Sequence, residues 1–277
     1  MHSRARLGQN FLVDVHAVER IVAALGDLGG RTVVEIGPGR GAITGALAAR
    51  AGHVLAVELD RELAANLRGQ FPPARVTVVE QDVLDFDFPA ACEGPPAAPG
   101  GRLRVAGNLP YYITSPILLK LAASHAVLDL AVLMVQREVA DRVVAQPGSR
   151  DYGLLSVTVQ MYGPVERLFT LPPGAFSPPP EVYSTVLRWR FAPRFDELGV
   201  SEHAFLRFVR SAFAQKRKTL ANNLRAAGVA PAAAAAALDA AGVLPQARAE
   251  TLPLEAFAVI WRSLLAADAG LAADLVR

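Results

Sequence analysis

The segment Asn108-Leu109-Pro110-Tyr111 has the residue types needed to act on the amino group of a nucleobase. Such an amine is a poor nucleophile because its lone pair is delocalised into the ring. Acceptors aimed at its hydrogens, here the Asn108 side-chain oxygen and the Leu109 carbonyl, favour a pyramidal nitrogen and stabilise the positive charge that develops during transfer of a methyl group. Tyr111 could stack on a base taken out of its helix or loop. The alternative is an ordinary strand-to-helix turn, with Asn as its cap and Pro as its start.

A second candidate site is the glycine segment Gly37-Pro38-Gly39-Arg40-Gly41, which follows a β-rich run containing Glu35. Glycines let the backbone turn sharply and approach a ligand closely, and the N-terminus of the following helix offers free N–H donors. The spacing Gly37-x-Gly39-x-x-Ala42 also fits the dinucleotide-binding pattern. A purely structural tight turn is the remaining alternative.

Two acids narrow the choice of cofactor. Glu58 ends the next predicted strand, about twenty residues beyond the glycines, where a carboxylate can accept hydrogen bonds from ribose hydroxyls. Asp82 follows the third predicted strand, a position suited to an adenine amino group. Either acid alone could be a solvated charge at a strand end. Together with Glu35 they favour S-adenosylmethionine over a nicotinamide, whose second half would need phosphate-binding features that we do not find.

Alternating strand and helix signals predict the elements that position these residues. Asp14 is the expected N-cap of the first helix, which Gly26 closes. The pattern predicts helices at 15–25, 42–51 and 61–70 and strands at 32–36, 53–59, 75–80, 103–106 and 128–135. This alternation is typical of a parallel sheet with helices on both faces, whose ligands bind at the carboxyl ends of the strands.

The pattern changes in the last third of the chain. A late strand is predicted at 182–191, as one of an antiparallel edge pair, and from about residue 201 the signals are helical. We place a boundary in the Pro- and Gly-containing stretch 192–200, which gives a domain of residues 1–193 and a helical domain of residues 194–277. The Pro/Gly/Ala-rich stretch 92–101 is expected to be a surface loop.

Composition sets limits on the class of protein. The chain has 277 residues, of which 52% are hydrophobic and 19% charged, enough apolar surface for a core. The single cysteine, Cys92, excludes an intrachain disulfide and a Cys-rich metal site, and no metal is expected. No membrane span or signal peptide is expected either, so cytoplasmic residence is the default.

A net charge of +2 does not by itself indicate nucleic-acid binding, but one stretch is strongly basic. Between residues 207 and 225 there is no Asp or Glu, and the cations are Arg207, Arg210, Lys216, Arg217, Lys218 and Arg225. With Phe205, Phe208 and Phe213 as a core stripe, these side chains would form an RNA-docking face on the C-terminal helices. A merely solvated helix face is the alternative.

Taken together, the motifs closely resemble those of the ribosomal RNA adenine N6-dimethyltransferases. The matching segments are residues 7–12, 35–41, 108–111, 148–153, 176–182, 215–220 and 248–252, which span nearly the whole chain. The resemblance implies a Rossmann-like S-adenosylmethionine methyltransferase sheet with a small all-helical C-terminal domain. It also implies dimethylation of two adjacent adenosines in a hairpin loop near the 3′ end of small-subunit rRNA, on an assembling particle. Separately, we expect the protein to be a monomer.

The resemblance assigns residues to roles. The cofactor is expected to contact Asn10, Leu12, Gly37, Gly39, Glu58, Asp82, Val83 and Asn108. The target adenine is expected to lie against Asn108, Leu109, Tyr111 and Phe176, with Tyr111 and Phe176 on its two faces. The prolines after Phe176 predict a stiff, exposed loop there, and an ordinary core Phe is the alternative.

Four other functions stay open from the sequence. The antibiotic-resistance branch methylates large-subunit rRNA with the same chemistry; Leu7-Gly8, Leu109 and the basic helices favour the small-subunit branch. DNA adenine methyltransferases tend to carry a second proline in place of Leu109. A non-catalytic RNA-binding assembly or transcription factor and a nicotinamide oxidoreductase are the remaining alternatives, although intact Asn108 and Gly37 argue against lost catalysis.

Overall fold

The computed structural model describes residues 9–93 and 101–267, and these residues divide into two compact units. The described residues up to Ala140 together with Pro164–Phe191 form the first unit, and Asp141–Gly163 with the described residues from Ala192 onward form the second. The division predicted after residue 193 places Asp141–Gly163 in the first domain, whereas the structure places this segment in the second unit. The catalytic and docking roles of the two parts stay a prediction. Leu7 and Gly8 lie outside the described residues.

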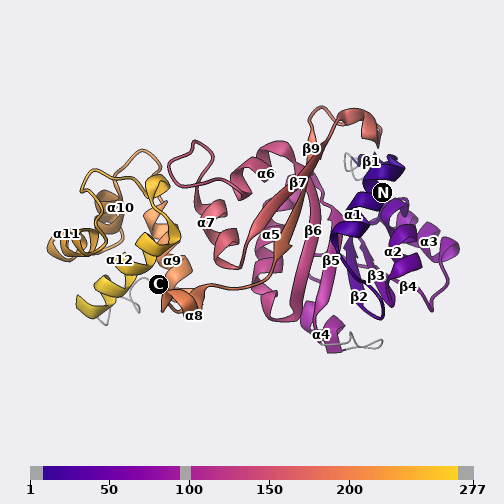
Figure 1. Ribbon diagram of the computed structural model, residues 1–277, viewed down its shortest axis with the longest axis horizontal. Coiled ribbons are helices and arrows are strands. Elements are labelled where there is room, and N and C mark those ends of the chain that lie inside the picture. Colours follow the sequence, from indigo (N-terminus) through magenta and orange to yellow (C-terminus); the bar gives the residue numbers. More distant parts are fainter. Residues whose placement is uncertain (1–8, 94–100, 268–277) are drawn as a thin grey trace, which may run out of the picture. The chain divides into compact units, whose positions relative to one another are not determined.

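The first unit is built on a seven-stranded sheet (Figure 1). Its strand order is β4-β3-β2-β5-β6-β9-β7. The bounds are β2 Thr32–Ile36, β3 His53–Glu58, β4 Val76–Glu80, β5 Leu103–Asn108, β6 Leu128–Gln136, β7 Val165–Leu171 and β9 Ser184–Arg190. Strands β2 to β6 are mutually parallel, so their carboxyl ends meet at one edge, and the order reverses beside β2, where ligands of such sheets bind.

The antiparallel strand β9 lies between β6 and β7, and with β7 it forms the antiparallel pair at this edge of the sheet that the sequence predicts. The edge strand is β7, which the sequence pattern does not predict. Its outward residues include Glu166 and Arg167, a charged pattern typical of exposed edges. Burial explains the interior place of β9, because Thr185, Val186, Leu187 and Trp189 are all buried.

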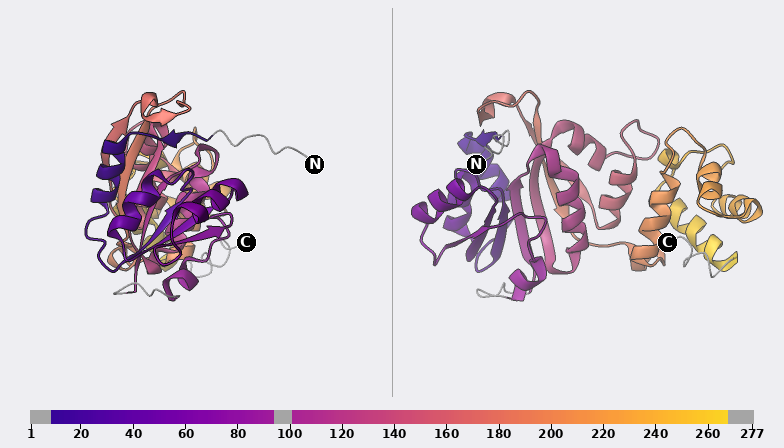
Figure 2. Two further views of the ribbon diagram at one scale, coloured as in Figure 1. Left: turned by 90° about the vertical axis from the view of Figure 1, so that its right-hand side faces the viewer. Right: turned by 180° about the vertical axis from the view of Figure 1, so that it is seen from behind.

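Helices lie against this sheet in both the front and rear views (Figures 1 and 2). They are α1 Val15–Ala24, α2 Ala42–Arg50, α3 Arg61–Gln70, α4 Phe88–Glu93, α5 Thr114–Ala123 and α6 Arg137–Val143, which runs across the unit boundary. The predicted cap is confirmed, because Asp14 Oδ1 accepts the Ala17 N–H at 3.0 Å. Cys92 belongs to α4, so the predicted loop begins later, and most of it lies outside the described residues.

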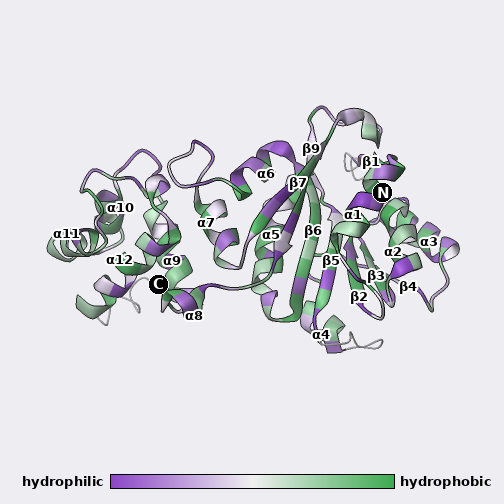
Figure 3. Cartoon of the chain, viewed as in Figure 1, coloured by the Kyte–Doolittle hydropathy of each residue, from purple (hydrophilic) through white to green (hydrophobic). Residues whose placement is uncertain are grey.

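Every residue of β2 is buried, as expected for a parallel strand covered on both faces. Strand β6 is likewise hydrophobic along most of its length (Figure 3). Helices α1 and α2 contribute Ile21, Val22, Ile43 and Leu47 to a cluster that covers one face of the sheet. This core fixes the strand ends on which the candidate site residues lie.

A short second sheet joins distant parts of the chain. Strand β1, Phe11–Leu12, pairs antiparallel with β8, Phe176–Ser177, with Leu12 opposite Phe176. Two-residue strands carry no detectable periodicity, so this pairing was not predicted.

The second unit is helical. Its helices are α7 Leu154–Met161, α8 Phe195–Leu198, α9 Glu202–Ala212, α10 Leu220–Ala226, α11 Pro231–Ala240 and α12 Leu254–Ala267. Phe205 and Phe208 are fully buried, and Phe208 stacks on Trp261 with ring centroids 5.2 Å apart. The predicted fold class is therefore confirmed. Over the described stretches, none of the helices has the length and apolarity that crossing a membrane requires.

Candidate active site

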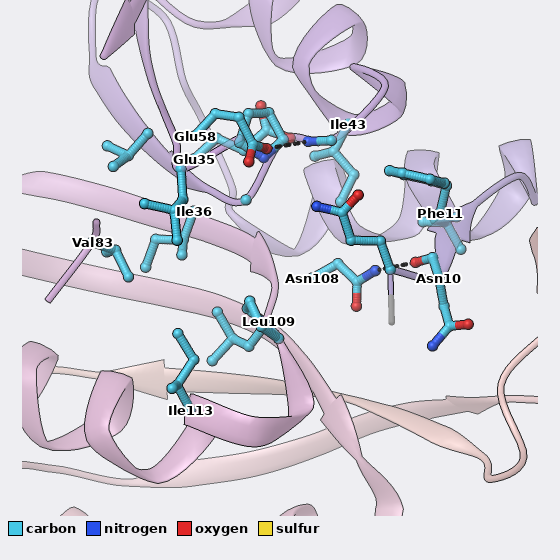
Figure 4. A pocket seen from close by; sticks show the side chains of 18 of the residues that line it. Asn10, Phe11, Glu35, Ile36, Ile43, Glu58, Val83, Asn108, Leu109 and Ile113 are labelled. Atoms are coloured by element: carbon cyan, nitrogen blue, oxygen red, sulfur yellow. Dashed lines mark hydrogen bonds between the residues drawn. The ribbon is translucent and has the colours of Figure 1, made fainter. Parts of the chain in front are cut away.

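A cavity of about 310 Å³ opens where strands β2, β3, β4 and β5 end (Figure 4). This volume lies at the lower end of the range of small-molecule sites. All of its lining residues belong to the first unit. Of the predicted cofactor and substrate contacts, the cavity brings together Asn10, Leu12, Gly37, Gly39, Glu58, Asp82, Val83, Asn108, Leu109 and Tyr111.

The glycine loop forms one wall of the cavity. Gly37, Gly39 and Gly41 all have φ between +58° and +86°, a conformation that favours glycine. A Cβ atom on Gly39 would lie 2.9 Å from Cδ1 of Phe11, so glycine is also needed for space. Helix α2 starts directly after Gly41, and its N-terminus faces this loop.

Glu58 is fixed by the backbone around it. Its Oε2 accepts the Gly39 N–H at 3.0 Å, and its Oε1 accepts the Asp60 N–H at 2.9 Å. Burial raises the pKa of Glu58, although these two hydrogen bonds act in the opposite direction. The carboxylate therefore links the glycine loop to the end of β3 and keeps further lone pairs for a donor in the cavity.

Asp82 lies two residues beyond β4, in the turn that leaves the sheet. Its Oδ1 accepts the Leu84 N–H at 2.9 Å, which fixes the orientation of the carboxylate at the cavity wall. The adjacent Val83 is 7% exposed and supplies an apolar surface beside it. An acid next to an apolar side chain is suited to the edge and the face of a purine.

Glu35 is a buried acid in the same wall, at 1% exposure. Burial raises its pKa to about 8, the nearby Glu58 carboxylate adds to the rise, and Thr44 opposes it. Its Oε2 has no hydrogen-bond partner. A buried carboxyl group without a positive neighbour is well placed to respond to a cationic ligand.

Asn108 is oriented by the N-terminal segment. Its Nδ2 donates to the Asn10 carbonyl at 2.9 Å (Figure 4). This bond uses the amide nitrogen, so Oδ1 is the atom that can accept a hydrogen bond from a ligand. The Leu109 N–H donates to the Met134 carbonyl at 2.9 Å, which fixes the backbone of the motif against β6.

The Tyr111 hydroxyl shares a hydrogen bond of 2.9 Å with the Ser184 hydroxyl at the start of β9. Burial raises the pKa of Tyr111, so the phenol keeps its proton at neutral pH. The bond holds the ring beside Asn108 at the mouth of the cavity.

The structure separates Phe176 from the other predicted residues. Its side chain is 3% exposed, belongs to the hydrophobic cluster that includes Leu12 and Leu171, and does not line the cavity. The expectation of an exposed loop is wrong at this residue, because pairing with β1 turns Phe176 into the core. Its role on a face of the adenine stays a prediction.

The cavity fits S-adenosylmethionine at three points. Two acids, Glu58 and Asp82, line the cavity at strand ends where ribose hydroxyls and an adenine amine need acceptors. The glycine loop allows close approach of a ligand to the backbone. Glu35 supplies a buried carboxyl group whose Oε2 has no partner, which suits a ligand that carries a sulfonium and an ammonium group.

The predicted RNA-docking residues lie in the second unit and do not contribute to the cavity. Arg207 and Arg210 are on α9 and Arg225 is on α10, but Lys216, Arg217 and Lys218 occupy the turn between these helices, which corrects the expectation that all six are helical. The turn is held by the buried Asn223, whose Nδ2 donates to the carbonyls of Ala212 at 2.7 Å and Gln215 at 3.3 Å. The three cations of the turn are all exposed.

Sequence reasoning missed several cavity residues. They include Phe11, Arg40, Ile43, Leu59, Tyr112 and Ile113. The Arg40 guanidinium lies over the Phe11 ring, 4.3 Å from the ring centroid. This contact joins residues that are far apart in the sequence. For Arg40 and Tyr112 a signal was available, because Arg40 lies within the glycine segment and Tyr112 directly follows the reaction motif.

Comparisons with known proteins identify the family to which the chain is similar. The model of the family described as ribosomal RNA adenine dimethylase matches residues 1–265. A protein of Acidobacterium capsulatum named Ribosomal RNA small subunit methyltransferase A is 62% identical over 262 residues, which cover 94% of this chain and 91% of the relative. A protein of the same name from Koribacter versatilis is 51% identical over 270 residues, covering 94% of each chain.

Solved structures are similar in fold. A dimethyladenosine transferase from Plasmodium falciparum superimposes with a TM-score of 0.73 at 20% identity, over 90% of this chain and 95% of that chain. The 23S rRNA methyltransferase ErmE superimposes with a TM-score of 0.69 at 26% identity, over 92% and 99%. The family match and the methyltransferase relatives identify S-adenosylmethionine, and not a nicotinamide, as the cofactor. The chain belongs to the ribosomal RNA adenine dimethylase family.

Proposed function

We propose that this enzyme dimethylates the exocyclic amines of two adjacent adenosines in the 3′-terminal hairpin loop of small-subunit rRNA, on an assembling small subunit. Support for the small subunit comes from the names of the relatives that are 62% and 51% identical, compared with 26% identity to the large-subunit enzyme of known structure. We further propose that the protein acts as a monomer in the cytoplasm, where its substrate is assembled.

The orientation of Asn108 carries this proposal. The Asn10 carbonyl accepts a hydrogen bond from the amide N–H of Asn108 at 2.9 Å, which leaves Oδ1 as the atom that can accept from a ligand. Bound S-adenosylmethionine supplies an electrophilic methyl group. Asn108 Oδ1 and the Leu109 carbonyl hold the hydrogens of the target amine, so its lone pair is freed from the ring and the developing positive charge is stabilised.

The remaining residues position the reactants. Tyr111, held by Ser184, offers its ring to the face of the adenine, and Pro110 fixes the turn between Asn108 and Tyr111. Glu58 and Asp82, which line the same cavity at the ends of other strands, would bind the methyl donor. With both reactants held in line, positioning supplies most of the rate acceleration.

Mass spectrometry of rRNA from cells that lack this protein tests the proposal. Dimethyladenosine should disappear from small-subunit rRNA and return with the wild type. Asn108→Ala should not restore it, because loss of one such acceptor lowers the rate roughly 100- to 1,000-fold. Leu119→Ala, an exposed change on α5, is the matched control and should restore the modification. Dimethyladenosine that persists without the protein, or that is lost from the large subunit instead, contradicts the proposal.

A further inference from the structure

Two exposed tyrosines flank the candidate reaction site. Tyr112 is 60% exposed and lines the cavity mouth, and Tyr183 is 49% exposed. Large aromatic side chains are usually covered in a folded protein, so exposed rings beside an active site suggest contact with a ligand. Neither tyrosine has a role in the methyl transfer itself.

A hydrogen bond brings the segments of these tyrosines together. Tyr111, which precedes Tyr112, bonds through its hydroxyl to Ser184, which follows Tyr183, at 2.9 Å. In the antiparallel pair of β6 and β9, Ser184 lies opposite Gln136. Tyr183 is therefore just beyond the carboxyl end of β6, on the same edge of the sheet as Asn108.

Arg137 adds a positive charge next to one ring. Its N–H donates to the Tyr183 carbonyl at 3.0 Å, and its guanidinium lies 5.8 Å from the centroid of the Tyr183 ring. The side chain is exposed, at the first position of α6. A ring with an arginine beside it offers flat aromatic and guanidinium surfaces on which a base can stack.

The distance to the reaction site suits a neighbouring nucleotide. Asn108 lies opposite Met134 on β6, and Met134 lies opposite Val186 on β9. The reaction motif and the strand that carries Tyr183 are thus separated by two strand spacings, roughly 10 Å. A base next to a flipped-out adenosine remains within that range of it.

We propose that Tyr112, Tyr183 and Arg137 form an aromatic shelf that stacks the unpaired base adjacent to the target adenosine. This inference rests on the proposed function and adds a second RNA subsite to it. Proteins commonly recognise unpaired RNA by stacking its bases on exposed aromatic rings. The exposed acid Glu181, two residues before Tyr183, would repel a phosphate, so the base is the better partner there.

The shelf explains how adjacent adenosines can be modified in turn. Stacking uses the face of a base and not its amino edge, so it tolerates methyl groups on the amine. A dimethylated adenosine can therefore occupy the shelf while its neighbour enters the reaction site. The same subsite serves both rounds of the reaction.

Steady-state methylation of a hairpin RNA with two adjacent loop adenosines tests the shelf. The comparison RNA has a single loop adenosine beside an abasic nucleotide. For the wild type, loss of the neighbouring base should raise the KM for RNA roughly 10-fold or more, with less effect on kcat. Tyr183→Ala and Tyr112→Ala should raise the KM for the intact hairpin. With either variant, the abasic RNA should raise the KM little further, because the stacking contact is already absent.

Tyr183→Phe and Tyr112→Phe keep the ring and should behave as the wild type, and Leu119→Ala on α5 is the exposed control. S-adenosylhomocysteine should bind Tyr183→Ala with unchanged affinity in calorimetry, because Tyr183 does not line the cavity. The shelf is overturned if the increases in KM caused by a tyrosine variant and by the abasic RNA multiply when the two are combined. It is also overturned if the tyrosine variants have no effect on KM. Variants impaired only on whole particles would assign the tyrosines to a protein partner instead. A wild type that methylates neither hairpins nor small-subunit particles contradicts the proposed function itself.

Discussion

Glu35 couples the cofactor cavity to the stability of the fold. Burial raises its pKa to about 8, so the folded protein retains the proton near neutral pH, whereas the unfolded chain loses it at the ordinary value of 4.5. The stability that comes from binding this proton is fully present below pH 4.5. It is lost progressively between pH 4.5 and 8, because over this range unfolding releases a proton that the folded state still holds, and the loss is complete once the pH has risen through 8.

Glu35→Gln should therefore change the pH dependence of unfolding. Between about pH 5 and pH 8 the wild type should lose stability relative to the variant, by up to about 1.4 kcal/mol per pH unit. Urea unfolding of both proteins at pH 5, 6.5 and 8 measures the difference. The pKa of Glu58 is also raised, but Glu58 is present in both proteins, so its contribution to the pH dependence largely cancels in the comparison. Parallel stability curves over this range would show that Glu35 is already ionised in the folded protein.

Residues whose role depends on local sequence could be predicted at the site. Asn108, Glu58 and Asp82 each end or follow a predicted strand, and all three line the cavity. Phe11 could not be predicted, because its place against Gly39 depends on the path of β1 across the glycine loop. Phe176 shows the converse: its local sequence indicates a loop, but pairing with a distant strand buries it.

Among the elements, β2 and β5 leave no room for a side chain at Gly107, next to the reaction motif. Gly107 lies opposite Ile36, and a Cβ atom on Gly107 would be 2.7 Å from the Ile36 carbonyl oxygen. Backbone cannot move aside as a flexible side chain can. Glycine at this position therefore keeps the glycine loop and Asn108 at their spacing.

Gly107→Ala should lower the free energy of unfolding by roughly 1–3 kcal/mol, as other overpacked core positions do. It should also reduce methylation by displacing Asn108. Gly69→Ala is the matched control: this residue is in α3, an added Cβ meets nothing within 4 Å, and alanine should stabilise the helix by about 0.5–1 kcal/mol. Denaturant unfolding of both variants measures these changes, and equal effects would show that the strands can separate without cost.

Strands β2 to β6 could be predicted from the sequence because each is a compact apolar run bounded by turn residues, whereas helices α4 and α5 between them were not predicted. No element was predicted in the stretch 137–175, although it contains α7 and β7. Strand β7 is only partly buried, so its pattern lacks the continuous apolar run of an interior strand. The existence of elements was thus easier to predict than their order in the sheet, which depends on pairing between segments far apart in the chain.

At the scale of the whole molecule, long-range interactions define the second unit. The segment Asp141–Gly163 joins the C-terminal helices through specific bonds: the Tyr162 hydroxyl donates to Glu202 Oε1 at 2.7 Å, and the Gly148 N–H donates to the Glu250 carbonyl at 2.8 Å. A boundary derived from composition cannot detect such an exchange of chain segments. It does find the stretch near residue 192, where the chain returns to the second unit.

The turn between α9 and α10 is where the second unit should contribute most to RNA binding. Lys216, Arg217 and Lys218 are exposed there. The buried Asn223 fixes the turn by donating hydrogen bonds to two of its backbone carbonyls. Each cation that binds a phosphate releases condensed counterions from the RNA, so affinity falls as salt rises. A rigid turn presents three such charges without the entropy of ordering a mobile segment.

Alanine replacement of Lys216, Arg217 and Lys218 should weaken binding to immature small subunits and flatten its salt dependence. Because the triple variant can no longer neutralise three phosphates, the slope of log K against log salt concentration should become shallower by about 2 to 3. Arg50, Arg61 and Arg68 on α2 and α3 are a matched control, because their replacement removes the same charge from exposed positions of the first unit. Affinity for S-adenosylhomocysteine should stay the same in both triple variants, since none of these residues lines the cavity. An equal loss of slope in the two variants would mean that net charge, and not the turn, determines docking.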